Sequence, residues 1–276
     1  MFTNIIINML EGIFSNITNF AGESSALISP MNTYNEQIFN WSKQILENVM
    51  MPVSTTILAL FALLELHRAS LKMDSMGSSG MPAEIVIKIL FRVAMAKIAL
   101  DSIPIIMQAL YNLTTYLTTR ISSFLQVTEI TGIDVSQYRD SIEDLDFGQQ
   151  LGQFSTCLLV KGITWIATKV ASIIVSARFI EIYLYFAVSP IPAATFLSDE
   201  HSQIGKNFLK SFAAACLQGT LIYIVLSFFP ILMGGALADS TAGIDGALSG
   251  AMGYSLVLVV SIFSTGKWSK SIVGAS

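Results

Sequence analysis

The chain has 276 residues, of which 53% are hydrophobic and only 12% are charged, and its net charge is −4. Soluble domains carry about 25% charged residues, so this composition excludes a conventional water-soluble globule. The small net charge excludes a general attraction to nucleic acid, and any anion binding must come from lysines and arginines at particular positions. The chain is therefore predicted to be an integral membrane protein.

The first 20 residues predict an amphipathic helix. Neither Lys nor Arg occurs before Lys43, so the segment is not typical of a signal peptide and has no basic face for anionic lipid. We expect this helix to lie on the bilayer surface or against a neighbouring part of the protein, within an outer segment 1–48. Its apolar side chains recur at steps of three and four residues, at Phe2, Ile6, Met9, Ile13, Ile17 and Phe20.

Uncharged apolar runs predict the membrane crossings. Residues 211–238 and 246–266 contain no charged side chain, and about 20 such residues span the hydrocarbon of a bilayer. Pro52 is expected in the first turn of its span, where the missing amide costs little, and Pro104 is expected to kink its span. The sequence predicts an all-α polytopic transmembrane bundle over residues 49–276, with crossings at about 49–66, 84–110, 153–177, 208–233 and 246–265.

The distribution of charged residues orients this bundle. Segment 1–48 has one Lys against four Glu, and the loop at about 126–150 has one Arg against six acidic residues. Cytoplasmic connections are rich in Lys and Arg, so both segments are expected outside. The carboxyl-terminal tail with Lys267 and Lys270 is expected inside. These assignments give about five crossings, with the amino terminus outside and the carboxyl terminus inside.

Segment 182–197 is uncharged but contains the sequence Ser189-Pro190-Ile191-Pro192, and two prolines so close together cannot continue a regular helix. A consistent orientation requires this segment to dip into the membrane and return, or to lie flat; a sixth crossing is the main alternative. Irregular backbone at membrane depth must be covered by protein or face a watery cavity. The segment therefore predicts either helix packing or a hydrated passage.

Charges on the second predicted span fall on opposite faces. Lys97 and Asp101 are four residues apart, and a lone charge at this depth costs at least ~2.5–3.5 kcal/mol. We therefore predict a buried ion pair that faces the bundle interior. Lys88 and Arg92 lie near the predicted inner end, where their long side chains can reach the interface.

The third predicted span carries a polar stripe that must avoid lipid. The stripe either packs against partners or lines a water-filled path, and its small residues also allow close approach of another helix. It consists of Lys161, Trp165, Thr168, Ser172 and Ser176, with Lys169 at its edge.

Small residues on the last two spans also permit close helix packing, and they are Ala215, Gly219, Gly246, Gly250 and Gly253. Arg178 and Glu181 follow the third span at a spacing typical of a structural pair. Cys157 and Cys216 lie in apolar runs without the spacing of metal ligands. No enzyme motif is present, so we expect neither catalysis nor a cofactor or metal.

Four short runs after residue 176 resemble a known family. They are similar to the TrbL-type polytopic membrane subunit of conjugative type IV secretion systems, particularly to its Gram-positive members. The resemblance assigns Arg178, Glu181, Ser189, Pro190 and Pro192 to the shared central segment of the family. The runs are Ala177-Arg-Phe-Ile-Glu-Ile-Tyr-Leu-Tyr, Ser189-Pro-Ile-Pro-Ala-Ala-Thr-Phe, Gly205-Lys-Asn-Phe-Leu-Lys-Ser and Leu217-Gln-Gly.

The resemblance implies an inner-membrane channel component that helps carry single-stranded DNA, with its attached protein, out of a donor cell. It also implies a homo-oligomer in contact with secretion ATPases and other channel proteins. A hydrated path with spaced cations would favour the phosphates of such a strand. Lys161 and Lys169, followed by Lys97, are the candidates to line it. Two alternatives stay open: a small-solute transporter, although no internal repeat relates two halves of the chain, and a scaffold with no passage of its own.

Overall fold

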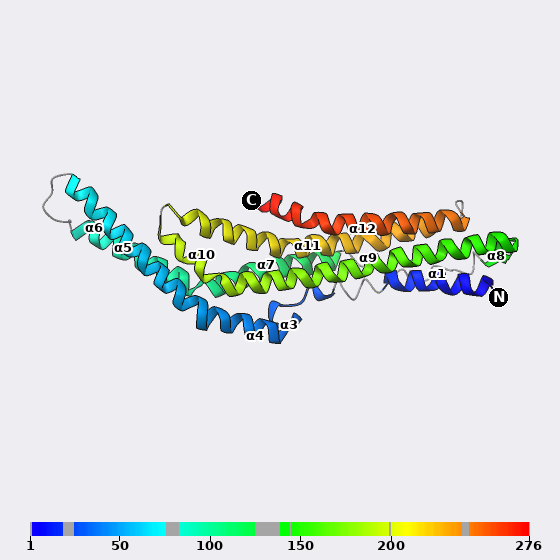
Figure 1. Cartoon of the computed structure of the whole chain (residues 1–276), viewed down its shortest axis with the longest axis horizontal. Coiled ribbons are helices and arrows are strands. Elements are labelled where there is room, and N and C mark those ends of the chain that lie inside the picture. The colour runs from blue at the N-terminus through cyan, green and yellow to red at the C-terminus, as the bar shows by residue number, and fades with distance from the viewer. Residues whose placement is uncertain are drawn as a thin grey trace. The chain divides into compact units, whose positions relative to one another are not determined.

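The computed structural model describes residues 2–18, 25–75, 83–124, 139–143, 145–198, 200–238 and 243–275 (Figure 1). Every regular element in these ranges is a helix, which confirms the predicted all-α class. The elements are α1 (Phe2–Thr18), α3 (Met31–Tyr34), α4 (Glu36–Ile45), a π-helical turn (Leu46–Met50), α5 (Met51–Ser75), α6 (Ala83–Asp101), α7 (Ile103–Phe124), α8 (Arg139–Glu143), α9 (Phe147–Val188), α10 (Pro190–Ala194), a 3-10 turn (Thr195–Leu197), α11 (Ser202–Ala238) and α12 (Gly243–Val273).

Four helices in the described ranges are long and apolar enough to cross a membrane: Glu36–Leu71, Phe147–Val188, Ser202–Gly235 and Gly243–Val273. They contain the predicted crossings at 49–66, 153–177, 208–233 and 246–265. In the most apolar part of Ser202–Gly235, 56% of the residues are buried, and in the most apolar part of Glu36–Leu71 only 11% are buried. The helix α11 is therefore the most enclosed of the four, and α5 presents most of its surface outward.

The predicted crossing at 84–110 is not one continuous helix. The helix α6 ends at Asp101 and α7 begins at Ile103. At the break, the amides of Ile105 and Ile106 both donate to the carbonyl oxygen of Ser102, and Pro104 has no amide to donate. The interruption therefore lies beside the proline that was expected to kink the span. The charges of α6 lower its apolar character, so its crossing stays a prediction.

The helix that contains the first predicted crossing also includes residues before it. It runs from α4 through the π-helical turn into α5, and Pro52 is the second residue of α5. At the π-helical turn, the amide of Met51 donates to the carbonyl oxygen of Leu46, five residues back. This wider turn shifts the register of the backbone hydrogen bonds immediately before Pro52, which has no amide hydrogen to donate.

Two other helices extend beyond the crossings predicted within them. The helix α9 has 42 residues, which at ~1.5 Å per residue is about 63 Å, or about twice the ~30 Å of bilayer hydrocarbon. Arg178 and Glu181 therefore lie inside α9, and the irregular backbone expected over 182–197 begins only at Ser189. The turn expected at Gly234 and Gly235 is helical, since α11 continues to Ala238 and a glycine costs a helix only about 1 kcal/mol.

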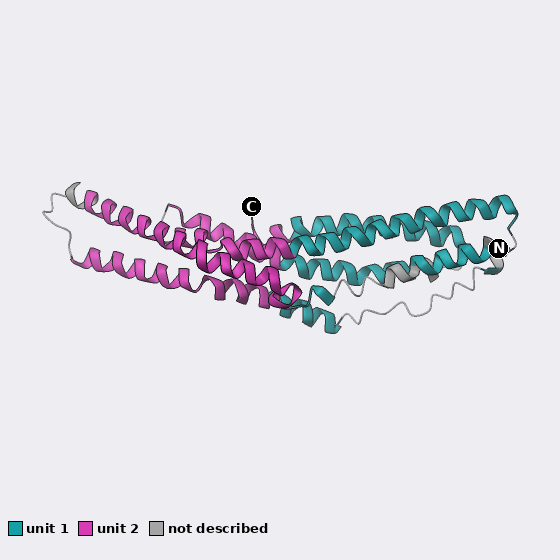
Figure 2. Ribbon diagram, turned by 60° about the horizontal axis from the view of Figure 1, so that its bottom comes forward, with its two compact units in different colours: residues 1–29, 114–178, 217–268 teal, residues 30–113, 179–216, 269–276 magenta. Residues whose placement is uncertain are grey.

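The chain forms two compact units (Figure 2). Unit 1 consists of Met1–Ser29, Thr114–Arg178 and Leu217–Trp268, and unit 2 consists of Pro30–Leu113, Phe179–Cys216 and Ser269–Ser276. The helices α7, α9, α11 and α12 each contribute residues to both units. The boundary predicted at residue 48 stays a prediction.

In unit 1, α1 lies along α9 (Figure 1). Its inward side chains, Ile6, Ile7, Leu10 and Ile13, are each at most 6% exposed. Of the two surroundings expected for this amphipathic helix, the structure shows packing against protein. The helix α1 also contacts α8. Gln150 at the start of α9 holds the end of α8, because its amide nitrogen donates to the carbonyl oxygen of Ile142 at 3.2 Å.

Unit 2 has an aromatic core that fixes α3 to the second half of α9. The hydroxyl of Tyr183 donates to the carbonyl oxygen of Met31 at 2.9 Å and accepts from the amide of Asn35 at 3.3 Å. The ring of Tyr34 stacks on Phe179 with a centroid distance of 3.6 Å. These contacts hold the chain next to the start of α4, which leads into the first candidate span.

Candidate functional site

Three consecutive residues of α11 contact three other helices of unit 1. Gln218 bonds to α12, Gly219 receives a side chain of α9, and Thr220 bonds to α7. Successive residues of an α-helix point about 100° apart, so one short stretch of α11 faces three neighbours at the same height. We call Gln218, Gly219 and Thr220, together with the residues they contact on α7, α9 and α12, the polar layer.

At the centre of the polar layer, the guanidinium of Arg178 packs on the backbone of Gly219. Arg178 is only 4% exposed although it lies in a candidate span. A Cβ added to Gly219 would overlap the guanidinium carbon and both terminal nitrogens. The residue that the sequence singled out for helix packing therefore provides the space for a buried cation. Ala215, one turn earlier on α11, is also buried.

Threonines join α7 to α11 within the polar layer. The hydroxyl of Thr118 donates to the carbonyl oxygen of Thr114 at 2.8 Å and lies 2.8 Å from the hydroxyl of Thr220. Either hydroxyl can donate to the other, because the hydroxyl of Thr220 also lies within 3.4 Å of the carbonyl oxygen of Thr114. Thr118 and Thr220 are 2% and 5% exposed, so this interhelical hydrogen bond is shielded from water.

Gln218 joins α11 to α12 on the other side of the polar layer. Its amide nitrogen donates to the hydroxyl of Thr265 at 3.5 Å, and that hydroxyl donates to the carbonyl oxygen of Ile262 at 2.6 Å. Hydrogen bonds between membrane helices contribute about 0.6 kcal/mol each on average. The polar layer therefore fixes the rotation and relative height of four helices.

The broken segment after α9 forms a second close contact, within unit 2. The hydroxyl of Thr195 donates to the carbonyl oxygen of Pro192 at 2.7 Å and accepts from the amide of Gly205 at 3.1 Å. A Cβ on Gly205 would lie 2.6 Å from a ring carbon of Phe196. Gly205 therefore lets the start of α11 lie directly against the segment that follows α10.

The irregular backbone of this segment is covered by protein. Ser189 is 0% exposed, and its hydroxyl donates to the carbonyl oxygen of Phe186 at 2.8 Å. Pro190 is also buried, Pro192 is half-buried, and α10 packs against α5 and α6. This meets the requirement that non-helical backbone at membrane depth be shielded from lipid. Of the two interpretations of Ser189–Pro192, these contacts favour helix packing.

The polar stripe of α9 is exposed in its middle and half-buried at both ends. Lys161 is half-buried, and a Cβ on Gly12 of α1 would lie 3.3 Å from its Nζ. Trp165 is 54% exposed and Lys169 is exposed. Thr168, Ser172 and Ser176 are half-buried, and the Thr168 hydroxyl donates to a carbonyl oxygen of its own helix.

Lys97 and Asp101 form an ion pair on α6. Their side chains are 44% and 54% exposed in the single chain. The burial that the sequence predicts would therefore have to come from another chain, and it stays a prediction. The side chain of Glu181 is half-buried.

The three glycines predicted for close packing on α12 are not buried in the single chain. Gly246 and Gly250 are half-buried, and a Cβ on Gly253 would have open space around it. The inward small residues of this helix are Ala247 and Ala251, at 2% and 1% exposed. Close packing at the three glycines also stays a prediction.

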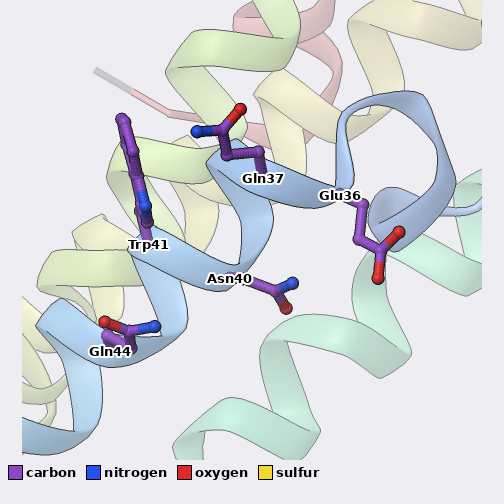
Figure 3. Close-up of a pocket in the computed structure, with 5 residues that line it drawn as sticks. All are labelled: Glu36, Gln37, Asn40, Trp41 and Gln44. Carbon is purple, nitrogen blue, oxygen red and sulfur yellow. The ribbon is translucent and has the colours of Figure 1, made fainter.

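A hollow of about 430 Å³ lies beside α4, and it is not a built binding site. All its lining residues come from α4, and they are Glu36, Gln37, Asn40, Trp41 and Gln44. Figure 3 shows these side chains diverging, with Trp41 and Gln37 on one side and Glu36 and Asn40 on the other. Among the described residues there is also no cluster of His, Cys, Asp or Glu that could hold a metal ion. Cys157 and Cys216 are buried and unpaired with each other.

The sequence runs that suggested a family meet at these two close contacts. Arg178, from the first run, packs on Gly219 of the last run, and Thr195 of the second run bonds to Gly205 of the third. Residues 15–190, well over half of the chain, match the family described as TrbL/VirB6 plasmid conjugal transfer like protein. The chain belongs to the TrbL/VirB6 family. No curated protein and no solved structure matches it.

Membership of the TrbL/VirB6 family, together with the apolar helices, makes the chain a multi-pass bacterial membrane protein and a membrane component of a conjugative transfer system. Such a component acts with the membrane and with other type IV secretion subunits. Members of the family are structural parts of the secretion system.

Several residues of the site were missed by the sequence reasoning. Gln218 belongs to the run Leu217-Gln-Gly, and the signal for it was this polar residue beside the small residue Gly219. Thr118, Thr265 and Gly12 had no comparable signal, because isolated threonines and glycines are common in membrane helices. Their roles depend on which residue of another helix lies opposite.

Proposed function

We propose that this TrbL/VirB6 family protein is a channel subunit in the cytoplasmic membrane that helps move single-stranded DNA with its attached protein during conjugation. Membership of the TrbL/VirB6 family supports a role in conjugative transfer, and the polar stripe of α9 supports a passage for the strand. The observation that carries the proposal is that Trp165 and Lys169 are exposed in a helix apolar enough to span the membrane.

The chemistry of the stripe suits a single strand of nucleic acid. Lysines neutralise backbone phosphates, and an exposed indole offers a face on which any base can stack. Lys161, Trp165 and Lys169 lie at steps of four residues, so each is displaced from the next by about one helical turn. Ser172 and Ser176 continue the stripe with hydroxyl groups. A strand along this face would meet cations and an aromatic ring without sequence-specific contacts.

The proposed arrangement has an outer segment 1–48 and a transmembrane domain 49–276, with five crossings, the amino terminus outside and the carboxyl terminus inside. The exposed stripe needs shielding from lipid, which a ring of identical subunits around a central path would provide. The same assembly would cover Lys97 and Asp101 on α6 and the glycines of α12. Secretion ATPases are the proposed partners on the inner face.

The first experiment measures DNA transfer from donors that lack the gene and carry plasmid-borne variants. We expect deletion to abolish transfer with normal growth. We expect the double variant Lys161→Gln and Lys169→Gln to lower transfer by about tenfold or more, because it removes both cations that would neutralise phosphates along the stripe. The matched control is Lys43→Gln, which removes a lysine whose side chain is 53% exposed and outside the stripe. All variants are compared at equal amounts in the membrane.

A scaffold without a passage is the second candidate, and the polar layer favours it, because its contacts are buried and join helices. Crosslinking the moving strand to Trp165 variants distinguishes the two functions. Transfer that depends on the chain but never yields a crosslink, and that tolerates the double lysine variant, would support the scaffold. Normal transfer in the deletion strain would contradict both and direct attention to solute uptake.

A further inference from the structure

The helix α1 covers one lysine of the polar stripe and leaves the other exposed. At Gly12 the backbone of α1 comes so close to α9 that a Cβ there would lie 3.3 Å from the Nζ of Lys161 and 3.5 Å from its Cε. Lys169, two turns further along α9, is exposed. Figure 1 shows α1 alongside the first part of α9. With α1 in this place, no strand of nucleic acid fits between it and the Lys161 ammonium.

The attachment of α1 is apolar. Its buried contacts come from Ile6, Ile7, Leu10 and Ile13. Among the side chains of α1 that the structure describes, none forms a hydrogen bond or an ion pair with another helix. Apolar contacts are not directional, so residues 3–13 of α1 can separate from α9 without leaving a buried polar side chain of their own unpaired. Gly12 contributes by allowing the close approach and by adding no side chain that would interlock with α9.

We propose that α1 is a displaceable cover over the Lys161 end of the stripe, and that it moves away when the stripe takes up its polyanionic substrate. The inference rests on the proposed function, since it gives the covered lysine a part in transfer. In the closed state the Lys161 ammonium lies beside α1 at Gly12, and in the open state it is available to phosphate. The lysine pair then acts in sequence, with Lys169 always exposed and Lys161 exposed only after α1 has moved.

The first test measures thiol accessibility in the full-length protein in membranes, with Cys157 and Cys216 replaced by alanine. Lys161→Cys and Lys169→Cys are labelled with a maleimide, each with and without Leu10→Asp, which places a charge at a buried apolar contact of α1. We expect Leu10→Asp to raise the labelling rate at position 161 several-fold and to leave position 169 unchanged. Equal labelling at position 161 with and without Leu10→Asp would overturn the cover. If the alanine background fails to fold, the native cysteines are kept, since both are 0% exposed.

The second test tethers the cover in place. A bis-maleimide with a reducible spacer links Gly12→Cys to Lys161→Cys in donor cells, and DNA transfer is measured before and after reduction. We expect the tether to reduce transfer and the reductant to restore it to the level of the unlinked double variant. The two single cysteine variants, treated with the same reagent, show the effect of modification without a tether.

The outcomes separate this inference from the proposed function. Undiminished transfer with α1 tethered would overturn the cover, even if the double lysine variant is defective. A tether that blocks transfer while Lys161→Gln and Lys169→Gln transfer normally would uphold the movement of α1 and overturn the lysine path. Loss of transfer in both experiments supports the two proposals together.

Discussion

At the residue scale, the guanidinium of Arg178 occupies the space that a side chain at Gly219 would fill. The guanidinium is 4% exposed in a candidate membrane span. A charge in such surroundings is stable only if it is surrounded by protein dipoles and shielded from lipid. The contact requires both a long cationic side chain on α9 and a glycine at the facing position of α11, so neither residue can be varied independently.

This pairing predicts that Gly219→Ala is destabilising. The added methyl group overlaps the guanidinium, and overpacking of this kind costs about 1–3 kcal/mol. We expect a lower midpoint of thermal unfolding in detergent and less chain in the membrane. The matched control is Gly162→Ala on α9, where a Cβ would have nothing within 4 Å. There the change should be neutral or stabilising, since alanine favours a helix over glycine by ~1 kcal/mol. Equal effects at the two glycines would contradict the pairing.

At the element scale, α6 is a helix whose exposed face has two kinds of surface. Its centre is apolar, with Phe91 at 67% and Ile98 at 58% exposed. At 100° per residue, Lys88 lies on one flank of this strip and the pair Lys97 and Asp101 lies on the other. The apolar centre suits lipid, while the flanks suit contact with protein. This division explains how one helix can carry several charges beside the outward-facing α5.

The ion pair of α6 predicts a particular pattern of variants. Lys97→Met or Asp101→Leu alone leaves an unpaired charge at membrane depth, which costs at least ~2.5–3.5 kcal/mol. We expect either single variant to reduce assembly and transfer more than the double variant does. Measurement of membrane-inserted chain and transfer frequency checks this.

The control pair for this series is Lys43 and Glu47, which has the same spacing and side chains that are 53% and 55% exposed. It lies in the predicted outer segment, where an exposed pair contributes ~0–1 kcal/mol, so single and double variants there should be nearly neutral. Single and double variants of equal severity at Lys97 and Asp101 would exclude an ion pair shielded from water.

At the scale of the whole molecule, the number of crossings depends on two segments, α6 with α7 and the segment 182–197. The four apolar helices account for four of the five predicted crossings. Alkaline phosphatase and green fluorescent protein, fused within 126–150 or after Ser276, report which side each position occupies. We expect the loop outside, with active phosphatase, and the carboxyl terminus inside, with a fluorescent reporter.

Each alternative topology gives a different pair of results, because every crossing reverses the side. If α6 and α7 do not cross, the loop is inside and the carboxyl terminus outside. If 182–197 crosses as a sixth span, both positions are outside. Either result would show the five-crossing prediction to be wrong, and it would identify the segment responsible.

The sequence by itself determined the all-α class, the membrane location and four of the apolar spans. These properties follow from composition and periodicity, because bilayer thickness sets the length of an apolar helix. It also placed the interruption near Pro104 and indicated the family through short runs. It did not indicate that the first of these helices starts at Glu36 or that α9 and α11 extend beyond the predicted crossings, since a π-helical turn or a glycine within a helix changes local propensity very little.

Only the tertiary structure brought Arg178 to Gly219, Thr118 to Thr220 and Lys161 to Gly12. Each pair joins helices that are far apart in the sequence. Which residues face each other depends on how far each helix is rotated and shifted against its neighbour, and helical periodicity identifies a face without identifying its partner. Arg178 could therefore be recognised from the sequence as a charge in an apolar region, while the glycine that makes room for it became apparent only in the folded chain.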